Sequence, residues 1–240
     1  MRGKAIKPAL AALAALVAFP AASQEPAPPP LGLMGTVPIY WGEADGLGEL
    51  IGGGVEPHWA RAQLEAEFVL QPLDYLDAEA LAPFRHLLLA QPRALSGEEN
   101  VALDAWVRGG GRLLLFADPM MTGHSRFALG DRRRPMDVTL LSPILKHWGL
   151  VMEFAEDQPF GFRPLEAAGL TVPVNLPGAF AAGGSCELSA DRVLARCAIG
   201  EGSATVLADA ALLDLHEPDP LAGQALQGLM ALAFGETAGQ

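Results

Sequence analysis

The sequence contains few of the residues on which several classes of protein depend. Only 2 of its 240 residues are cysteines, and its 16 Lys and Arg residues are outnumbered by 28 Asp and Glu residues. The resulting formal net charge of −12 opposes contact with the phosphates of nucleic acids and with anionic lipids. Nucleic acid and anionic membrane surfaces are therefore excluded as main partners.

A hydrophobic run long enough to span a membrane is also missing. The apolar run at residues 8–19 follows a basic segment at 2–7 and precedes small residues at 21–23. It is shorter than the ~20 residues that a transmembrane helix needs, and this order is typical of a Sec-type signal peptide. We expect cleavage of residues 1–23, with an uncleaved anchor as the alternative. No Cys follows the run, which excludes a lipid-modified N-terminus, so we expect a periplasmic or secreted protein with no integral membrane span.

The remainder of the chain is expected to form one domain. Cleavage after Ser23 would remove three basic residues and change the formal net charge from −12 to −15. Residues 24–33 are rich in proline and are expected to form an extended tether. Residues 34–235 are numerous enough for a single folded domain, and residues 236–240 are expected to be a short tail.

The two cysteines, Cys186 and Cys197, lie close together in the sequence. An exported protein meets an oxidising compartment, so an even pair of cysteines predicts one disulfide. The intervening residues 187–196 can fold back as a hairpin and bring the two side chains together. Two buried free thiols are the alternative. A catalytic Cys is disfavoured, because neither residue lies at a strand-to-helix turn or beside a His in the sequence.

The order of hydrophobic patterns predicts an α/β protein. Strand patterns occur at residues 37–41, 68–76, 85–92 and 112–118, and helix patterns at 56–67 and 96–108. The runs "HLLLA" and "RLLLFA" are apolar throughout instead of alternating, which is typical of central parallel strands covered on both faces. Strands separated by helices therefore predict an open, mainly parallel sheet with helices on both faces.

Local signals place the ends of several elements. Ser96 and Glu99 have the spacing of a capping box at the start of a helix, which we expect to end at the glycines 109–111. The remaining expectations are a helical turn at 77–84, a loop at 120–138, a helix at 139–150 capped by Thr139 or Ser142 and ended by Gly149, and strands at 151–155 and 170–176. Three strands are expected within 184–213, with turns at 190–191 and 200–202, and a helix at 220–234.

Three stretches of the sequence together resemble a known family. They are "LLLAQPRALSGEENVALDAWVRGGGRLLLFADP", "LLSPILKHWGLVM" and "ARCAIGEGSATVLADAALL". The matching motifs are Pro92 through Glu99, Gly110-Gly111, Asp118-Pro119, Leu145 through Gly149, and Gly200 through Asp209. The pattern resembles the class I glutamine-amidotransferase-like domain of the extracytoplasmic auxiliary proteins of uncharacterised ABC transport systems, including gliding-motility accessories. The resemblance covers most of residues 34–235.

This resemblance implies a flavodoxin-like sheet, usually without a known enzymatic role, and an ABC-type permease or its accessory as partner. True amidotransferases carry a nucleophilic Cys on a sharp turn, paired with a later His and Glu. After the strand at 113–117 this chain has Asp118-Pro119 and no Cys. The resemblance therefore implies a non-catalytic domain that binds a partner protein or a glycan. A structural envelope protein without a small ligand is a further alternative.

Polar residues that follow the predicted strands are the candidate site residues. In an open parallel sheet, ligands bind beyond the carboxyl ends of the strands. This places Glu43, Asp45, Gln91, Arg93, Asp118 and His124 along one edge. Carboxylates near a His could bind a divalent cation or act as acid and base on a sugar or an ester, so a hydrolase using Asp118, His124 and Glu43 is the alternative function. Otherwise Asp118 caps a turn that Pro119 shapes, and the other acids are solvated.

Motifs for other chemistries are missing from the sequence. No His-x-x-x-His or Glu-x-x-His pair occurs, so no metal site is expected. Ser96 is not surrounded by Gly-x-Ser-x-Gly and is interpreted as a helix cap. The glycine-rich residues 41–54 lack the Gly-x-Gly-x-x-Gly order and contain three acids that would repel a phosphate. No cofactor is therefore expected.

Three consecutive arginines stand out against the acidic composition. Arg132, Arg133 and Arg134 could bind an anionic ligand or an acidic face of a partner. Alternatively, they form a solvated loop with surface ion pairs worth less than about 1 kcal/mol each. With Gln91 and Arg93, they complete the set of candidate binding residues.

Overall fold

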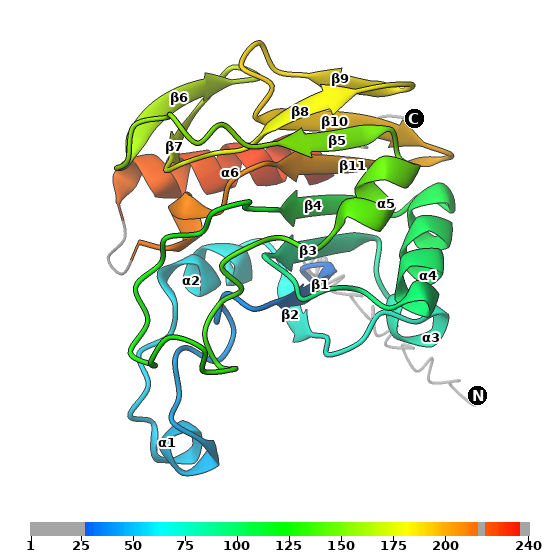
Figure 1. Ribbon diagram of the computed structural model, residues 1–240. Helices are drawn as coiled ribbons and strands as arrows, with labels where there is room; N and C mark the ends of the chain where they lie inside the picture. The colour runs from blue at the N-terminus through cyan, green and yellow to red at the C-terminus, as the bar shows by residue number, and fades with distance from the viewer. Residues whose placement is uncertain (1–26, 216–218, 236–240) are drawn as a thin grey trace, which may run out of the picture.

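The computed structural model describes residues 27–215 and 219–235 of the chain. Its centre is a seven-stranded sheet with the order β2-β1-β3-β4-β11-β10-β9 (Figure 1). In this order the strands are Val69–Pro72, Pro30–Gly35, His86–Ala90, Arg112–Phe116, Gly202–Leu207, Leu194–Ile199 and Cys186–Leu188. The first five are parallel, and β10 and β9 are antiparallel to their neighbours. The predicted mainly parallel sheet is confirmed, and the hairpin expected between Cys186 and Cys197 extends it at the β9 side.

Helices cover both faces of this sheet, as the predicted flavodoxin-like fold requires (Figure 1). The helices are α1 (Leu47–Gly52), α2 (Trp59–Glu65), α3 (Ala78–Leu81), α4 (Gly97–Arg108), α5 (Ser142–His147) and α6 (Pro220–Phe234), with a 3-10 turn, η1, at Ala211–Leu213. α2 and α6 belong to one hydrophobic core, and α3, α4 and α5 to the other. Alternate residues of β3 enter the two cores, Leu88 on one face and Leu87 and Leu89 on the other.

The capping box predicted for α4 is present. The Ser96 hydroxyl accepts a hydrogen bond from the Glu99 amide at 3.1 Å, and the Glu99 carboxylate accepts one from the Ser96 amide at 2.8 Å. Gly110 has φ 104°, a left-handed conformation that glycine adopts without strain, and the chain turns there into β4. The helix therefore begins and ends where the sequence predicted.

Two small sheets follow β4 in the chain. β5 (Leu150–Glu153) pairs antiparallel with β8 (Ala179–Ala182), and β6 (Arg163–Ala167) pairs antiparallel with β7 (Leu170–Val174). β8 contacts β9 and β10 of the main sheet, and β7 packs against α6. Both small sheets lie towards the β9 side of the molecule (Figure 1).

The first strand differs from the sequence prediction. β1 begins at Pro30, inside the expected tether at 24–33, and the expected strand at 37–41 is a turn. The physical reason is that the side chains of Leu31 and Leu33 are buried in the core that contains α2 and α6. The backbone of this strand pairs with β2 on one side and with β3 on the other. Pro30 is tolerated because it is the first residue of the strand. The expected signal peptide and the tail at 236–240 lie outside the described residues.

Other differences concern a helix cap and short elements. α5 begins after Leu141 without a side-chain cap, so the expected capping role of Thr139 or Ser142 was wrong. The strands β6 and β8 and the helix α1 were not predicted. The sequence of β6 contains Pro164, and β8 reads only "AFAA", so neither carries the run of β-branched residues that usually marks a strand.

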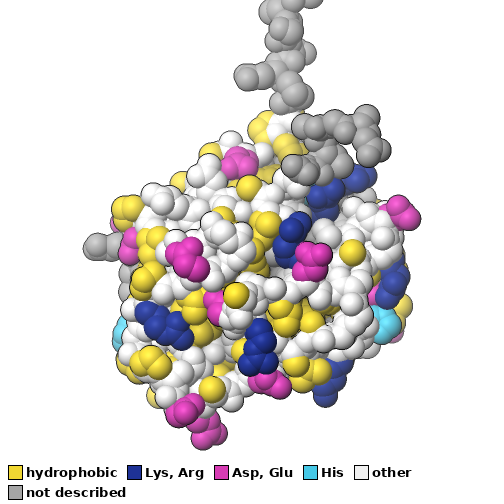
Figure 2. All heavy atoms as spheres, turned by 90° about the horizontal axis from the view of Figure 1, so that it is seen from above, with side chains coloured by type: hydrophobic (Ala, Val, Ile, Leu, Met, Phe, Trp, Pro, Cys, Tyr) yellow, Lys and Arg dark blue, Asp and Glu magenta, His cyan; other side chains and the backbone are white. Residues whose placement is uncertain are grey.

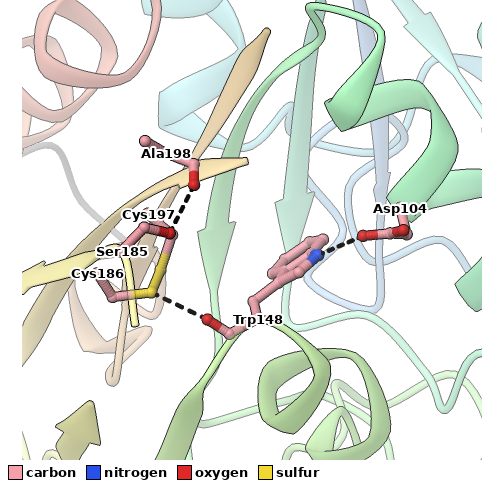
Figure 3. Close-up of a disulfide and its surroundings, with 6 residues drawn as sticks. All are labelled: Asp104, Trp148, Ser185, Cys186, Cys197 and Ala198. Atoms are coloured by element: carbon pink, nitrogen blue, oxygen red, sulfur yellow. Dashed lines mark hydrogen bonds between the residues drawn. A yellow bond between two sulfur atoms is a disulfide. The ribbon is translucent and has the colours of Figure 1, made fainter. Parts of the chain in front are cut away.

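Cys186 and Cys197 form the predicted disulfide (Figure 3). They are direct partners on the antiparallel strands β9 and β10, with their Cα atoms 4.0 Å apart, so the predicted hairpin is also confirmed. The Cys186 sulfur lies 3.2 Å from the carbonyl oxygen of Trp148, whose indole NH donates to Asp104 at 2.9 Å. The bridge thus joins β9 to β10 and lies against Trp148 at the end of α5, which is hydrogen-bonded to Asp104 of α4.

Candidate functional site

The loops that follow β1, β3, β4 and β11 all leave from the carboxyl ends of parallel strands, so they lie at the same end of the sheet. The loop after β1 carries α1, which stands apart from the sheet beside the long loop after β4 (Figure 1). Arg126 of the second loop joins them: its amide donates to the Glu43 carboxylate at 2.8 Å, and its guanidinium donates to Glu49 at 3.0 Å. The candidate site residues are distributed over these loops.

Gln91 and Asp118 are buried and hold the strand ends together. The Gln91 side chain donates to the Asp118 carbonyl at 3.0 Å and accepts from the Asp118 amide at 2.8 Å. The Asp118 carboxylate accepts from the amides of Met120 at 2.8 Å and Ala210 at 3.0 Å. Since Asp118 is only 1% exposed, it does not lie on a ligand-accessible edge. The turn-capping interpretation of Asp118 agrees with this geometry.

Asp209, at the end of β11, forms a buried pair with Asp118. Its carboxylate accepts from the Ala211 amide at 2.6 Å and from the Asn175 amide at 3.0 Å. Burial, together with the nearby Asp118 charge, raises the pKa of Asp209 well above its ordinary value. Burial also raises the pKa of Asp118 to about 6, and the Asp214 charge adds to the rise, although the two backbone amides oppose it. Asp209 ends the motif that begins at Gly200, but nothing in the sequence places it beside Asp118.

A small cavity is lined by two of the predicted residues, Glu43 and His124. Its volume is about 50 Å³, and its lining consists of Val37, Pro38, Glu43, His58, Met121, His124, Pro135, Leu213, Asp214 and Leu215. Glu43 and His124 therefore come together as the hydrolase hypothesis expected, but Asp118 is not part of the lining. His58 and Asp214 were missed, because nothing in the sequence places the segments around residues 58 and 214 beside the loop after β4.

His58 in this cavity has a structural role. Its Nδ1 accepts a hydrogen bond from the Ala60 amide at 3.1 Å, so the ring proton is on Nε2, which donates to the Leu213 carbonyl at 2.7 Å. The ring thereby caps α2 and fastens it to η1. The other charged or titratable side chains that line the cavity are those of Glu43, His124 and Asp214.

An apolar groove opens next to the cavity. This α1 groove has a volume of about 560 Å³ and is lined by Pro38, Trp41, Gly42, Glu43, Ala44, Leu47, Leu50, Ile51, Phe127 and Arg133. Pro38 and Glu43 belong to both linings. Trp41 is 57% exposed, Leu47 71% and Ile51 78%, although each is a large apolar side chain. The arrangement provides an apolar surface that ends at a polar cavity.

Arg93 lies away from this groove. Its guanidinium donates to both carboxylate oxygens of the buried Glu99 at 2.8 Å and to the Asp74 carbonyl at 2.8 Å. Burial alone would raise the pKa of Glu99, but Arg93 and the amides of Ser96 and Leu76 lower it to about 2. Arg93 is therefore engaged in holding the start of α4.

The three arginines of the loop after β4 have different surroundings. Arg132 is exposed. Arg133 pairs with Asp131 and Asp45, lies over the ring of Phe127 and lines the α1 groove. Arg134 donates to the carbonyls of Phe127 at 2.8 Å and Gly123 at 3.2 Å. Two of the three are thus occupied by the chain's own oxygen atoms, which weakens the hypothesis of a shared anion site.

Charge is not concentrated on the face opposite α1. Figure 2 looks down on the top of the view in Figure 1, and on that face basic and acidic side chains are interspersed with hydrophobic ones. Within residues 27–215 and 219–235, no three or more His, Cys, Asp or Glu side chains are grouped so that they could hold a metal ion. Over the same residues, no helix is long and apolar enough to cross a membrane.

Comparisons with known proteins show the fold alone. No family model matches the chain, and no curated protein matches it. The N-terminal domain of mmIFT52 superimposes with a TM-score of 0.56 at 14% identity, over 75% of this chain and 91% of that one. The β-galactosidase from Bacillus circulans sp. alkalophilus gives 0.50 at 13% identity, over 85% of this chain and 31% of that one. A ThuA-like protein from Bacteroides uniformis gives 0.48 at 11% identity, over 90% and 94%.

Proposed function

We propose that this chain is a non-catalytic, extracytoplasmic binding domain that holds a partner protein or a glycan in the α1 groove. The observation that carries the proposal is the exposure of Trp41, Leu47 and Ile51 around one apolar groove. Soluble proteins rarely expose such residues together unless they contact a ligand or a partner. An indole face can pack on the C–H face of a sugar or on an apolar side chain, and Glu43 and Arg133 supply polar contacts at the border.

The absence of a free cysteine thiol supports a binding role. Both cysteines are joined in the disulfide, so neither is available as an amidotransferase nucleophile. Asp118, at the end of the strand after which the resemblance expects that nucleophile, is buried with both carboxylate oxygens bonded to backbone amides. A side chain held in this way is suited to fixing a turn and poorly suited to proton transfer with a ligand.

The cellular setting follows from three expectations taken together. A disulfide forms and persists in an oxidising compartment, which agrees with the expected signal peptide. The resemblance to auxiliary proteins of ABC transport systems suggests an inner-membrane permease or its accessory as the partner. We therefore place the protein in the periplasm beside such a system.

Titration of soluble oligosaccharides into the mature protein, followed by calorimetry, tests the glycan form of the proposal. The Trp41→Ala variant should lose at least about tenfold in affinity, since truncating a central aromatic anchor typically costs ~2 kcal/mol or more. Phe160→Ser is the matched control, because Phe160 is 77% exposed and does not line the groove. Equal affinities of all three proteins would contradict the proposal.

A hydrolase is the second candidate function, because Glu43, His124 and Asp214 line one cavity that adjoins an apolar groove. His124 could act as a general base towards water, and Glu43 could donate a proton to a leaving alcohol. Turnover of chromogenic esters and glycosides should then fall at least about 100-fold in His124→Ala and Glu43→Gln. If the wild-type protein has no turnover, or if the variants retain it, this second candidate is rejected.

A further inference from the structure

The strand β5 is paired on one side only. Among the described residues, β8 is its single neighbour. The Gly183 amide donates to the Gly149 carbonyl at 2.8 Å, so residues 149 and 183 form a hydrogen-bonded pair. Because such pairs alternate along an antiparallel ladder, Val151 and Glu153 direct their backbone groups to β8, whereas Leu150 and Met152 direct theirs away from it.

A second observation confirms this orientation. Phe180 is the partner of Met152 on β8, and its amide donates to the Arg192 carbonyl at 2.7 Å, away from β5. Met152 and Phe180 are therefore a non-hydrogen-bonded pair. In the described part of the chain, the amide and carbonyl of Met152 have no hydrogen-bond partner. They form an open backbone edge.

This open edge borders a groove of about 320 Å³, here named the β5 groove. One wall consists of the five consecutive residues 150–154, and the other of Pro119, Val138, Thr139, Ser142, Leu145 and Lys146. Thr139 Oγ1 is buried there without a hydrogen-bond partner in the described chain. Val151 is 45% exposed on the strand wall. The groove thus combines apolar walls, an unused hydroxyl and an unused strand edge.

We infer that the free edge of β5 binds an extended segment of a partner protein as an added strand. An amide and a carbonyl that face outward from one strand are complementary to the backbone of another strand, and a sugar or an acyl chain does not reproduce this pattern. Apolar residues of the segment would pack on Val138 and Leu145, and an acidic residue would pair with Lys146. The inference goes beyond the proposed function, because the β5 groove and the α1 groove share no lining residue.

The same geometry disfavours a second copy of this chain as the occupant. In each copy, β5 lies between its own β8 and its own wall of α5 and residues 138–142. If the β5 strands of two copies paired, the wall of α5 and residues 138–142 in each copy would collide with that of the other. The strands could pair only if both walls moved. A single extended segment has no such wall.

Hydrogen exchange of the mature protein with a short blocked peptide of alternating Val and Thr and one central Asp tests the inference. Binding should slow exchange of the Met152 amide at least about tenfold, since that amide would gain a backbone acceptor. The Val151 amide, already bonded to β8, should change little. No slowing at Met152 at saturating peptide would overturn the inference.

Two variants separate backbone pairing from side-chain packing. Met152→Pro removes the outward amide and leaves the ladder to β8 intact, whereas Met152→Ala truncates the same side chain and keeps the amide. The peptide should bind Met152→Pro about fivefold more weakly than Met152→Ala, because an edge hydrogen bond is lost. Equal binding by the two variants, both with native circular dichroism, would overturn the inference.

Measuring the oligomeric state as a function of protein concentration tests whether a second copy of the chain occupies the β5 edge. Concentration-dependent dimerisation that protects Met152 without peptide, and that Met152→Pro abolishes, would assign the edge to a second copy and contradict the inference. A monomer at all concentrations supports it. Trp41→Ala should leave peptide binding unchanged, so failure of the α1 groove and failure of the β5 edge are distinguished.

Discussion

At the scale of single residues, the buried carboxyl groups of Asp118 and Asp209 connect the loops at the strand ends. Their four oxygens accept hydrogen bonds from the amides of Met120, Ala210, Asn175 and Ala211. These amides belong to three separate segments of the chain, so two acids fasten three loops. Burial of the two carboxyl groups also opposes their ionisation, so it raises the pKa of each.

This opposition predicts a pH dependence of stability. The pKa of Asp118 is about 6 in the folded protein, above its ordinary value of 3.8, so the unfolded chain releases the proton more readily. The stability from this group is therefore fully present below pH 4 and is lost as the pH rises through 6. The loss approaches about 3 kcal/mol, because each pKa unit corresponds to ~1.4 kcal/mol.

Urea unfolding between pH 4 and pH 7 measures this effect. In the wild-type protein the contribution of Asp118 should lower the free energy of unfolding as the pH rises, and in Asp118→Asn this dependence should be smaller. Asp118→Asn should also be less stable at pH 4, since its amide group faces a backbone donor where a carboxyl oxygen accepted. Parallel pH profiles of the two proteins would show that burial of Asp118 does not raise its pKa.

At the scale of secondary structure elements, the sequence predicted those whose signals are local. The continuous apolar runs of β3 and β4, the Ser96–Glu99 box of α4 and the span of α6 all appear where expected. β1 was misplaced because Pro30 obscured its beginning, and its pairing with β2 and β3 depends on residues far away in the sequence. α1 has no comparable signal, since every residue in it is at least partly exposed.

The start of α4 provides an element-scale prediction. Glu99 is buried and accepts hydrogen bonds from Arg93 and from the amides of Ser96 and Leu76. Glu99→Ala should lower the free energy of unfolding by about 3 kcal/mol, because the guanidinium of Arg93 and the amides of Ser96 and Leu76 would remain without their acceptor. Ser96→Ala should lower it by about 1 kcal/mol, the usual effect of removing an N-cap.

These free energies of unfolding can be measured by chemical denaturation of Glu99→Ala, Ser96→Ala and a control variant, Glu98→Ala. Glu98 is the exposed neighbour in the same first turn, so its variant should remain within about 0.5 kcal/mol of wild type. If Glu99→Ala is no less stable than Glu98→Ala, the network around Arg93 does not stabilise α4.

At the scale of the whole molecule, fold and site differ in how far the sequence predicts them. The central strands β3 and β4, the helices α4 and α6 and the disulfide follow from patterns within about 30 residues of the chain, as a βαβ unit does. The candidate site does not, because its cavity joins Glu43, His124 and Asp214 from three loops that meet only after the sheet has formed. The burial of Asp118 and the exposure of Trp41 also depend on how these loops pack, so the sequence alone does not predict either.

The whole molecule is expected to hold its partner in the α1 groove. Quantitative recovery of membrane components from cells expressing the full-length protein tests it most directly, with wild type, Trp41→Ala and the Phe160→Ser control purified side by side. We expect an ABC-type permease or its accessory to be recovered with wild type and with Phe160→Ser, and at least about tenfold less of it with Trp41→Ala. Undiminished recovery of the same component with Trp41→Ala would contradict it.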